Sequence, residues 1–276
     1  MLSQEHVGKT ITVVASYIDG QGTLESKASG ATASVAKPQG SNSTVDGVTV
    51  ETVQETNPDG SVSQKVTIPV VTPERVEETG NNTVADIPLF KAASGEMLLS
   101  AQLPVGLGLS MVGSTALRSA SDALTDLIRE IKAHTAAGSF DQDQLTGGGA
   151  GFLADLPAST SLLVQTVVPT VAANGVAGNA ALVINGVPAA SGKPMTALVI
   201  DAQALPAGTS IQLNNVEFAA VIGDVSVTGG AGSQHVWGDG GSQFIFLGAD
   251  DDVLHGGAGD DIVGSAGGND RVYGCL

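Results

Sequence analysis

The stretch LGADDDVLHGGAGDDIVGSAGGNDRVYG, residues 247–274, decides how the C-terminal part of this chain folds. It contains six aspartates and eight glycines in 28 residues. Closely spaced carboxylates repel one another, and glycine loses more conformational freedom on ordering than any other residue. The segment therefore needs a further partner that offsets both costs if it is to fold.

A period of nine residues runs through this stretch and continues before it. From residue 229 the sequence divides without insertions into GGAGSQHVW, GDGGSQFIF, LGADDDVLH, GGAGDDIVG and SAGGNDRVY. The eighth position is aliphatic throughout, at Val236, Ile245, Leu254, Val263 and Val272. The sixth position holds Gln234, Gln243, Asp252, Asp261 and Asp270. Phe218 and Val227 fall on the eighth-position track upstream. Five repeats in one frame favour an ordered repetitive fold over a disordered acidic tail.

These nonapeptides resemble the calcium repeat of RTX (repeats-in-toxin, hemolysin-type calcium-binding) proteins, G-G-x-G-x-D-x-U-x with U aliphatic. The resemblance is strong over residues 247–273 and weaker over residues 229–246. It implies a parallel β-roll whose U side chains stack inward. It also implies turns whose carbonyl and carboxylate oxygens hold Ca²⁺, a hard cation that prefers oxygen ligands.

The resemblance further implies which residues hold the metal. Successive turns of the roll alternate sides, so Asp252 and Asp270 share one side and a calcium lies between turns 247–252 and 265–270. Asp261 faces the other side, next to Gln243. Glutamine is neutral, so the two coils that contain Gln234 and Gln243 are interpreted as a metal-poor cap. The candidate metal-site residues are Asp252, Asp270, Asp261, Gly248, Asp250, Gly257, Gly259, Gly267 and Asn269.

Composition restricts the partners of the chain. Its 276 residues carry a formal net charge of −17, and 42% are hydrophobic but only 3% aromatic. This acidity argues against nucleic acid and anionic membranes as partners and favours a cation. No apolar run reaches transmembrane length. The N-terminal residues lack the apolar core of a signal peptide. The single cysteine, Cys275, excludes an internal disulfide.

The N-terminal third is predicted to contain two hairpins. Residues 7–36 contain β-rich runs around an Asp19-Gly20 turn signal. They resemble the last strands of the Ig-like or cadherin-like repeats of large bacterial surface proteins. Residues 1–37 are therefore assigned to the C-terminal part of such a repeat. Residues 38–110 form a linker and β-hairpin region, in which VTVETVQET and VSQKVTIPVV flank residues 57–60.

Residues 111–225 are expected to form one helix followed by a β-rich region. Residues 119–137 place Leu124, Leu127, Ile128 and Ile131 on one helix face. Ser121 is the expected cap and Gly138 the expected stop, whereas Asp126 and Glu130 are assigned to a solvated face. GGGAG, residues 147–151, lacks the lysine of a phosphate loop and is interpreted as a connector. The short β-branched runs from residue 160 onward fit a β-solenoid or a sandwich. Residues 226–276 are assigned to the truncated RTX roll.

The expected protein is mainly β: an Ig-like hairpin or sandwich remnant, a β-rich middle with one helix, and a C-terminal parallel β-roll. No H-E-x-x-H or G-x-S-x-G motif is present, so no enzyme is expected. The resemblance implies a calcium-binding structural or adhesion protein at the bacterial cell surface or outside the cell, exported by type I secretion, with cell-surface or matrix ligands. The alternatives are the non-catalytic part of an RTX-linked secreted hydrolase and a calcium-dependent surface-layer subunit.

Overall fold

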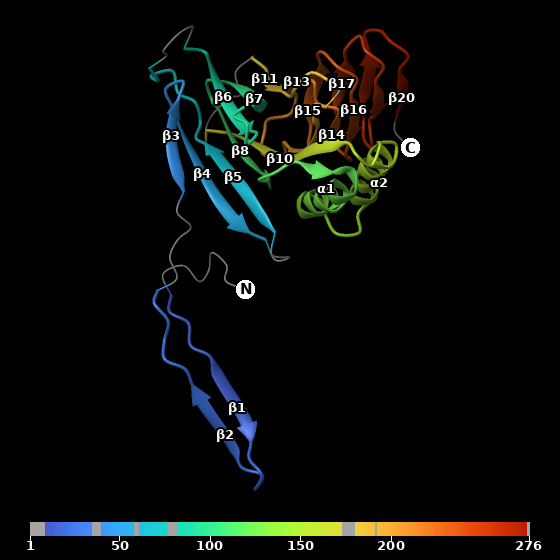
Figure 1. Ribbon diagram of the computed structural model, residues 1–276. Helices are drawn as coiled ribbons and strands as arrows, with labels where there is room; N and C mark the ends of the chain where they lie inside the picture. The colour runs from blue at the N-terminus through green and yellow to red at the C-terminus, as the bar shows by residue number, and fades with distance from the viewer. Residues whose placement is uncertain are drawn as a thin grey trace.

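The computed structural model describes residues 9–34, 40–57, 61–76, 82–172, 180–190 and 192–274 (Figure 1). Within these ranges the chain is mainly β with two helices. Cys275 and most of the predicted turn at residues 57–60 lie outside the described residues. No helix in the described ranges has the length and apolar character needed to cross a membrane.

The N-terminal hairpin is confirmed as a two-stranded antiparallel unit of β1 (Val14–Ile18) and β2 (Leu24–Ala28). Its turn is held by the carboxylate of Asp19, which accepts hydrogen bonds from the backbone N–H groups of Gln21 (2.9 Å) and Thr23 (2.8 Å). Every residue of both strands is exposed.

An antiparallel β-sandwich follows the hairpin, and its strands belong to a larger and a smaller sheet. The larger sheet contains β3 (Ser41–Val45), β4 (Val48–Thr56), β5 (Val62–Ile68) and β8 (Leu107–Ser114). The smaller sheet contains β6 (Val84–Lys91) and β7 (Met97–Pro104). The antiparallel pairing of β4 with β5 confirms the second predicted hairpin.

The same two sheets continue as a parallel stack (Figure 1). The larger sheet adds β10 (Ser161–Val171), β12 (Met195–Asp201), β14 (Phe218–Ile222), β16 (His235–Gly238), β18 (Val253–His255) and β20 (Arg271–Tyr273). The smaller sheet adds β11 (Leu182–Asn185), β13 (Thr209–Asn214), β15 (Val225–Gly229), β17 (Phe244–Leu247) and β19 (Ile262–Ser265). Parallel pairing starts at β10 and β12, upstream of residue 226. For the region from residue 160 onward the sequence fitted a β-solenoid or a sandwich, and the structure shows the parallel stack of a solenoid there.

The junction between the two parts is a change of strand direction inside each sheet. In the larger sheet β10 pairs antiparallel with β8 on one side and parallel with β12 on the other. In the smaller sheet β11 pairs antiparallel with β7 and parallel with β13. The edge of the parallel stack is therefore covered by hydrogen-bonded strands, which removes one exposed sheet edge.

The predicted aliphatic column lies inside the stack. Val236, Ile245 and Leu254 are completely buried. Val263 is partly buried against the same core, and Val272 on the last strand is 46% exposed. Full burial of one such side chain stabilises the fold by about 1.5 to 3 kcal/mol. Short strands can therefore form a core here, because each coil adds one more buried aliphatic side chain to the stack.

Phe218 is an exception to the predicted track. Val236 pairs with Ala219 and His235 pairs with Phe218, so this coil is one residue shorter than the next coil. A shift of one residue moves a strand side chain to the opposite face of the sheet. Phe218 consequently faces outward, where its ring stacks on Phe152 with centroids 5.2 Å apart. Its assignment to the inward track was wrong, whereas Val227 does lie opposite Ile245.

The outer face of the larger sheet is covered by two helices, α1 (Ala120–His134) and α2 (Phe140–Ala154). They follow the short strand β9 (Arg118–Ser119) and pack on the part of the sheet that contains β10, β12, β14 and β16 (Figure 1). The strands beneath are buried on both faces: β14, FAAVI, is a continuous apolar run, and β10 is buried without alternation from Leu162 to Val167.

The interpretation of GGGAG as a connector was wrong, because these residues lie inside α2. A Cβ on Gly148 would lie 2.4 Å from an atom of the Trp237 ring, and a Cβ on Gly149 would lie 2.9 Å from Leu127. Trp237 stacks in turn on His255, with ring centroids 3.4 Å apart. Gly148 and Gly149 are therefore explained by the close approach of α2 to β16 and to α1.

Helix α1 confirms the predicted position but not the predicted details of its ends and face. The cap is Ser119 rather than Ser121, and it accepts the N–H of Asp122. The last helical residue is His134, and Gly138 adopts a left-handed φ of 70° beyond it. Leu124, predicted on the buried face, is 37% exposed.

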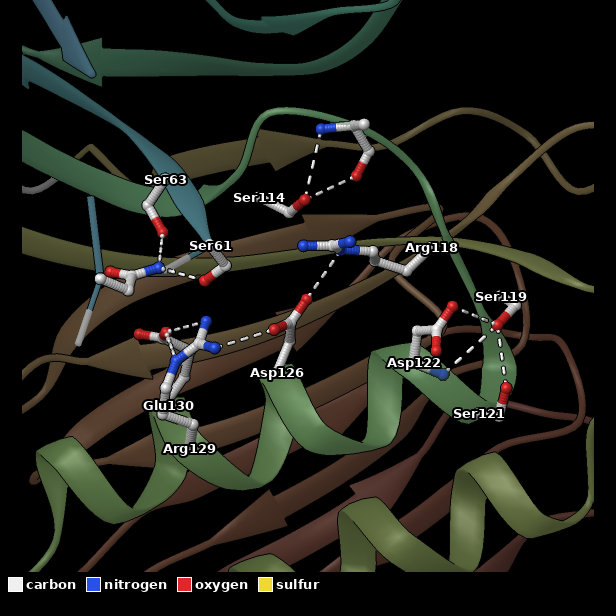
Figure 2. A network of polar contacts seen from close by, with 12 residues as sticks. Ser61, Ser63, Ser114, Arg118, Ser119, Ser121, Asp122, Asp126, Arg129 and Glu130 are labelled. Atoms are coloured by element: carbon white, nitrogen blue, oxygen red, sulfur yellow. Dashed lines mark hydrogen bonds and ion pairs between the residues drawn. The ribbon is translucent and has the colours of Figure 1, made fainter. Parts of the chain in front are cut away.

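Asp126 is buried rather than solvated, because two arginines neutralise it (Figure 2). Arg118 Nε donates to one carboxylate oxygen at 3.0 Å, and Arg129 Nη1 donates to the other at 2.9 Å. Glu130 is half-buried and accepts the hydroxyl of Thr166 at 3.0 Å. The polar face of α1 is thus tied to the larger sheet, which corrects its assignment to solvent.

Candidate metal centre in the turns of the roll

The sixth-position side chains of the repeats form two columns, one on each side of the roll. Gln234, Asp252 and Asp270 lie side by side, each directly before a strand of the larger sheet (β16, β18 and β20). Asp261 lies next to Gln243, just before strands of the smaller sheet. The structure therefore brings Asp252 and Asp270 together and places Asp261 on the opposite side.

A ladder of hydrogen bonds connects each column across a step of eighteen residues. The N–H of Gln234 donates to Asp252 Oδ1 at 2.8 Å, and the N–H of Asp252 donates to Asp270 Oδ1 at 3.0 Å. The N–H of Gln243 donates to Asp261 Oδ1 at 2.9 Å. One oxygen of each carboxylate is used in this way. The second oxygen of Asp252 accepts the hydroxyl of Ser265 at 3.4 Å, whereas the second oxygen of Asp261 is buried without a donor.

Three sixth-position oxygens are buried without a hydrogen-bond donor: Gln234 Oε1, Gln243 Oε1 and Asp261 Oδ2. The amide nitrogens of the two glutamines are used, since they donate to the carbonyls of Leu213 (2.9 Å) and Gly223 (3.2 Å). A buried acceptor without a donor is costly. These oxygens fit a cation, and the two glutamines belong to coils that the sequence suggested were poor in metal.

The glycines of the turns allow the backbones of successive coils to approach closely. A Cβ on Gly248 would lie 2.2 Å from the carbonyl oxygen of Gly230. At Gly257, with φ at 102°, a Cβ would lie 2.1 Å from the carbonyl oxygen of Asp239. Gly259 similarly faces the carbonyl of Gly241, whereas Gly267 is in ordinary contact with Ala249. Backbone carbonyls thus point across the gap between coils.

Asp250 and Asn269 lie at the exposed rim of the turns and also link coils. Asp250 Oδ2 accepts the N–H of Gly232 at 2.8 Å. The N–H of Asn269 donates at 2.8 Å to Asp251 Oδ1, a carboxylate that the sequence did not single out as a site residue. These side chains hold the turns in register from the outside, while the sixth-position side chains lie deeper.

Burial changes the proton affinity of the deeper acids. It raises the pKa of Asp252 to about 6, and the neighbouring carboxylate of Asp270 adds to this effect. Burial also raises the pKa of Asp261, with a smaller contribution from Asp260. Both shifts show that the ionised form lies in an unfavourable environment, which a nearby cation would improve.

Sequence reasoning missed Glu217, which extends the larger-sheet column upstream. Its carboxylate accepts the N–H of Thr196 at 2.7 Å, as Asp252 accepts that of Gln234. Burial raises the pKa of Glu217 to about 7. The coil that follows Glu217 is one residue shorter than the next coil. Glu217 therefore falls outside the nine-residue frame, and the repeat pattern does not identify it.

Asp239 was also missed. It is 7% exposed and accepts the N–H groups of Gly223 and Gly241, both at 3.0 Å. It also accepts the side-chain amide of Gln243. Asp239 stands in the second place of its repeat, GDGG, where the nonapeptide pattern has glycine, so the pattern does not indicate an acid at this position.

No group of three or more His, Cys, Asp or Glu side chains gathers as a metal cluster within the described ranges. The oxygens available in the turns belong instead to single carboxylates, side-chain amides and backbone carbonyls. Such mixed oxygen sets are the ligands of Ca²⁺ rather than of Zn²⁺ or copper. A scan of protein-family models, a search of curated proteins and a search of solved structures each found no match.

Proposed function

We propose that the C-terminal roll binds Ca²⁺ in its turns and that the ion stabilises the folded roll. The observation that carries this proposal is the set of three buried sixth-position oxygens without a donor, Gln234 Oε1, Gln243 Oε1 and Asp261 Oδ2. The carbonyls that face the turn glycines supply further hard oxygen ligands. The turns on both sides of the roll are included, because these oxygens lie in both columns.

The residues of this chain perform separate tasks in the proposed sites. Asp252, Asp261 and Asp270 supply negative charge, and each uses one oxygen to fix the neighbouring coil. Gly248, Gly257 and Gly259 let the carbonyls of the neighbouring coils approach closely. A bound cation offsets the repulsion between carboxylates, so its binding free energy becomes folding free energy.

We extend the proposal to the setting of the protein. An affinity of roughly 10⁻⁴ to 10⁻³ M is usual for extracellular calcium modules. A roll of that affinity folds outside the cell, which supports a structural or adhesion protein at the bacterial surface or beyond it, exported by type I secretion. The acidic composition, with a net charge of −17, is consistent with such a calcium-dependent role.

The hairpin of β1 and β2 is proposed to be the end of an Ig-like or cadherin-like repeat. Its paired residues place Val14, Ile18 and Leu24 on one face, whereas Tyr17 and Glu25 share the other. Such a two-faced hairpin suits one half of a sandwich. Amide exchange in β1 should slow in a longer chain that carries the preceding residues, and equal exchange in both chains would contradict this assignment.

Thermal unfolding during a calcium titration tests the main proposal. At 5 mM Ca²⁺, a site with the affinity above stabilises the fold by about 1 to 2 kcal/mol. Asp261→Asn should reduce this gain. Asp143→Asn, which removes the same charge from an exposed position on α2, should retain it. Unfolding at the same temperature in 5 mM Ca²⁺ and in chelator would refute the proposal, and an equal gain from Mg²⁺ would refute selectivity for calcium.

A further inference from the structure

The outer face of the smaller sheet differs from the rest of this acidic molecule. The helices pack on the larger sheet (Figure 1). The outward side chains of β11, β13, β15, β17 and β19 are partly or largely exposed. None of these outward side chains is charged, although the chain carries a net charge of −17. The acids of the roll lie in the turns at the ends of these strands.

One part of this face is a row of side-chain amides held in fixed positions. Asn214 Nδ2 donates to Asn185 Oδ1 at 2.8 Å, and Gln212 Nε2 donates to Asn214 Oδ1 at 3.4 Å. Ser226 and Thr228 on the next strand continue the polar surface. The row therefore presents donors and acceptors without a net charge.

The other part is a pair of aromatic rings on β17. Phe244 and Phe246 are 41% and 43% exposed, and their ring centroids lie 6.4 Å apart with planes inclined by 19°. A Cβ on Gly264 would lie 3.1 Å from two atoms of the Phe246 ring, so this ring covers the glycine of the next strand. The neighbouring Ile262 is 65% exposed. Together these side chains form an apolar platform beside the amide row.

The chemistry of the face selects its partner. Nucleic acids and anionic polysaccharides need cations, which this face lacks, and the acidic turns around it repel them. Pyranose rings offer C–H groups that pack on aromatic rings, and hydroxyls that pair with amides and with serine and threonine. Exposed apolar patches rimmed by polar residues mark interaction sites.

We propose that the outer face of β13, β15, β17 and β19 binds a neutral polysaccharide, with sugar rings on Phe244 and Phe246 and sugar hydroxyls on the amide row. This site lies outside the calcium turns. The inference goes beyond the calcium proposal, and the two are tested separately because the calcium concentration is held constant here.

The test is depletion of the full chain from solution by insoluble cellulose, chitin, starch and mannan at one saturating calcium concentration, with the anionic polymer alginate as a comparison. We expect binding to at least one neutral polymer and none to alginate. Phe244→Ala and Phe246→Ala should each weaken binding roughly two- to tenfold, in line with the free energies of aromatic contacts. Gln212→Ala should also weaken it.

Phe140→Ala is the matched control, because Phe140 is 48% exposed but lies on α2, away from the smaller sheet. It should bind like the wild-type chain. Equal losses in Phe140→Ala and Phe244→Ala would indicate non-specific adsorption and overturn the inference. Absence of binding to all four neutral polymers would overturn it as well. If light scattering instead shows a dimer that Phe244→Ala dissociates, the platform pairs with a second copy and the proposal is wrong.

Discussion

The fit of α2 against the roll makes a sharp prediction at two adjacent glycines. Gly147 and Gly148 lie in the same helix, but a Cβ on Gly147 would meet nothing within 4 Å. A Cβ on Gly148 would lie 2.4, 2.6 and 2.9 Å from three atoms of the Trp237 ring. Since Trp237 is stacked on His255 at 3.4 Å, its ring has little room to move away.

The two alanine variants should therefore change stability in opposite directions. Replacing glycine by alanine inside a helix stabilises a protein by about 0.4 to 1 kcal/mol when no clash results. Gly147→Ala should show this gain. Gly148→Ala gains the same helix propensity but overpacks the contact with Trp237, which costs about 1 to 3 kcal/mol. The difference between the variants isolates this steric cost.

Urea unfolding at fixed calcium measures both free energies. Circular dichroism reports the whole fold, and the fluorescence of Trp237, the one tryptophan of the chain, reports the contact itself. Gly148→Ala should change the emission of the folded state, whereas Gly147→Ala should leave it unchanged. If Gly148→Ala stabilises the protein as much as Gly147→Ala does, the described packing of α2 on β16 is incorrect.

Three further predictions concern Glu217, the His134–Asp201 pair and the aliphatic column. Because burial raises the pKa of Glu217 from 4.5 to about 7, its protonated form favours folding, and this contribution is lost as the pH rises through 7. Glu217→Gln should thus lose less stability than the wild type between pH 5 and pH 8, by up to about 3 kcal/mol, and parallel stability curves would contradict this. Asp201 lies 2.8 Å from His134 and raises the pKa of that imidazole, so the stabilisation is present below pH 6.5 and disappears above the raised pKa. In Asp201→Asn, an NMR titration should find a lower pKa for His134, and an unchanged value would exclude the ion pair. Leu254→Ala should cost about 2 to 5 kcal/mol in urea unfolding, because the side chain is completely buried. Val272→Ala, at a position 46% exposed, should change stability by no more than about 0.5 kcal/mol, and equal costs at both positions would contradict the inward column.

The roll was predictable from sequence because its order is repeated locally. Each coil carries its own aliphatic residue, and Val236, Ile245 and Leu254 mark the inward face without reference to distant parts of the chain. The spacing of Asp252 and Asp270 follows from the same period. Glu217 was not predicted because the coil after it is one residue shorter, which moves Glu217 out of the fixed nine-residue period.

The packing of α2 and the shared sheets were not predictable in this way. The three glycines of residues 147–149 have low helix propensity. The contacts of Gly148 with Trp237 and of Gly149 with Leu127 explain two of them, and neither contact is visible in the sequence. Asp126 looked like a solvated acid because its partner Arg118 lies outside the helix. β8 pairs with β10 across the two intervening helices, and nothing in the sequence of either strand indicates which strand is its partner.

The change of strand direction at β8 and β10 has a consequence for how the roll is assembled. In a stack whose layers contact only their neighbours, formation of the first layer is the slow step of folding. That layer loses conformational entropy before it can make stabilising contacts with an adjacent coil. Here the antiparallel sandwich supplies two ready-made edges, one in each sheet, for β10 and β11. We therefore expect the sandwich to act as the template on which β10 and β11 pair first, with the later coils added in order toward β20.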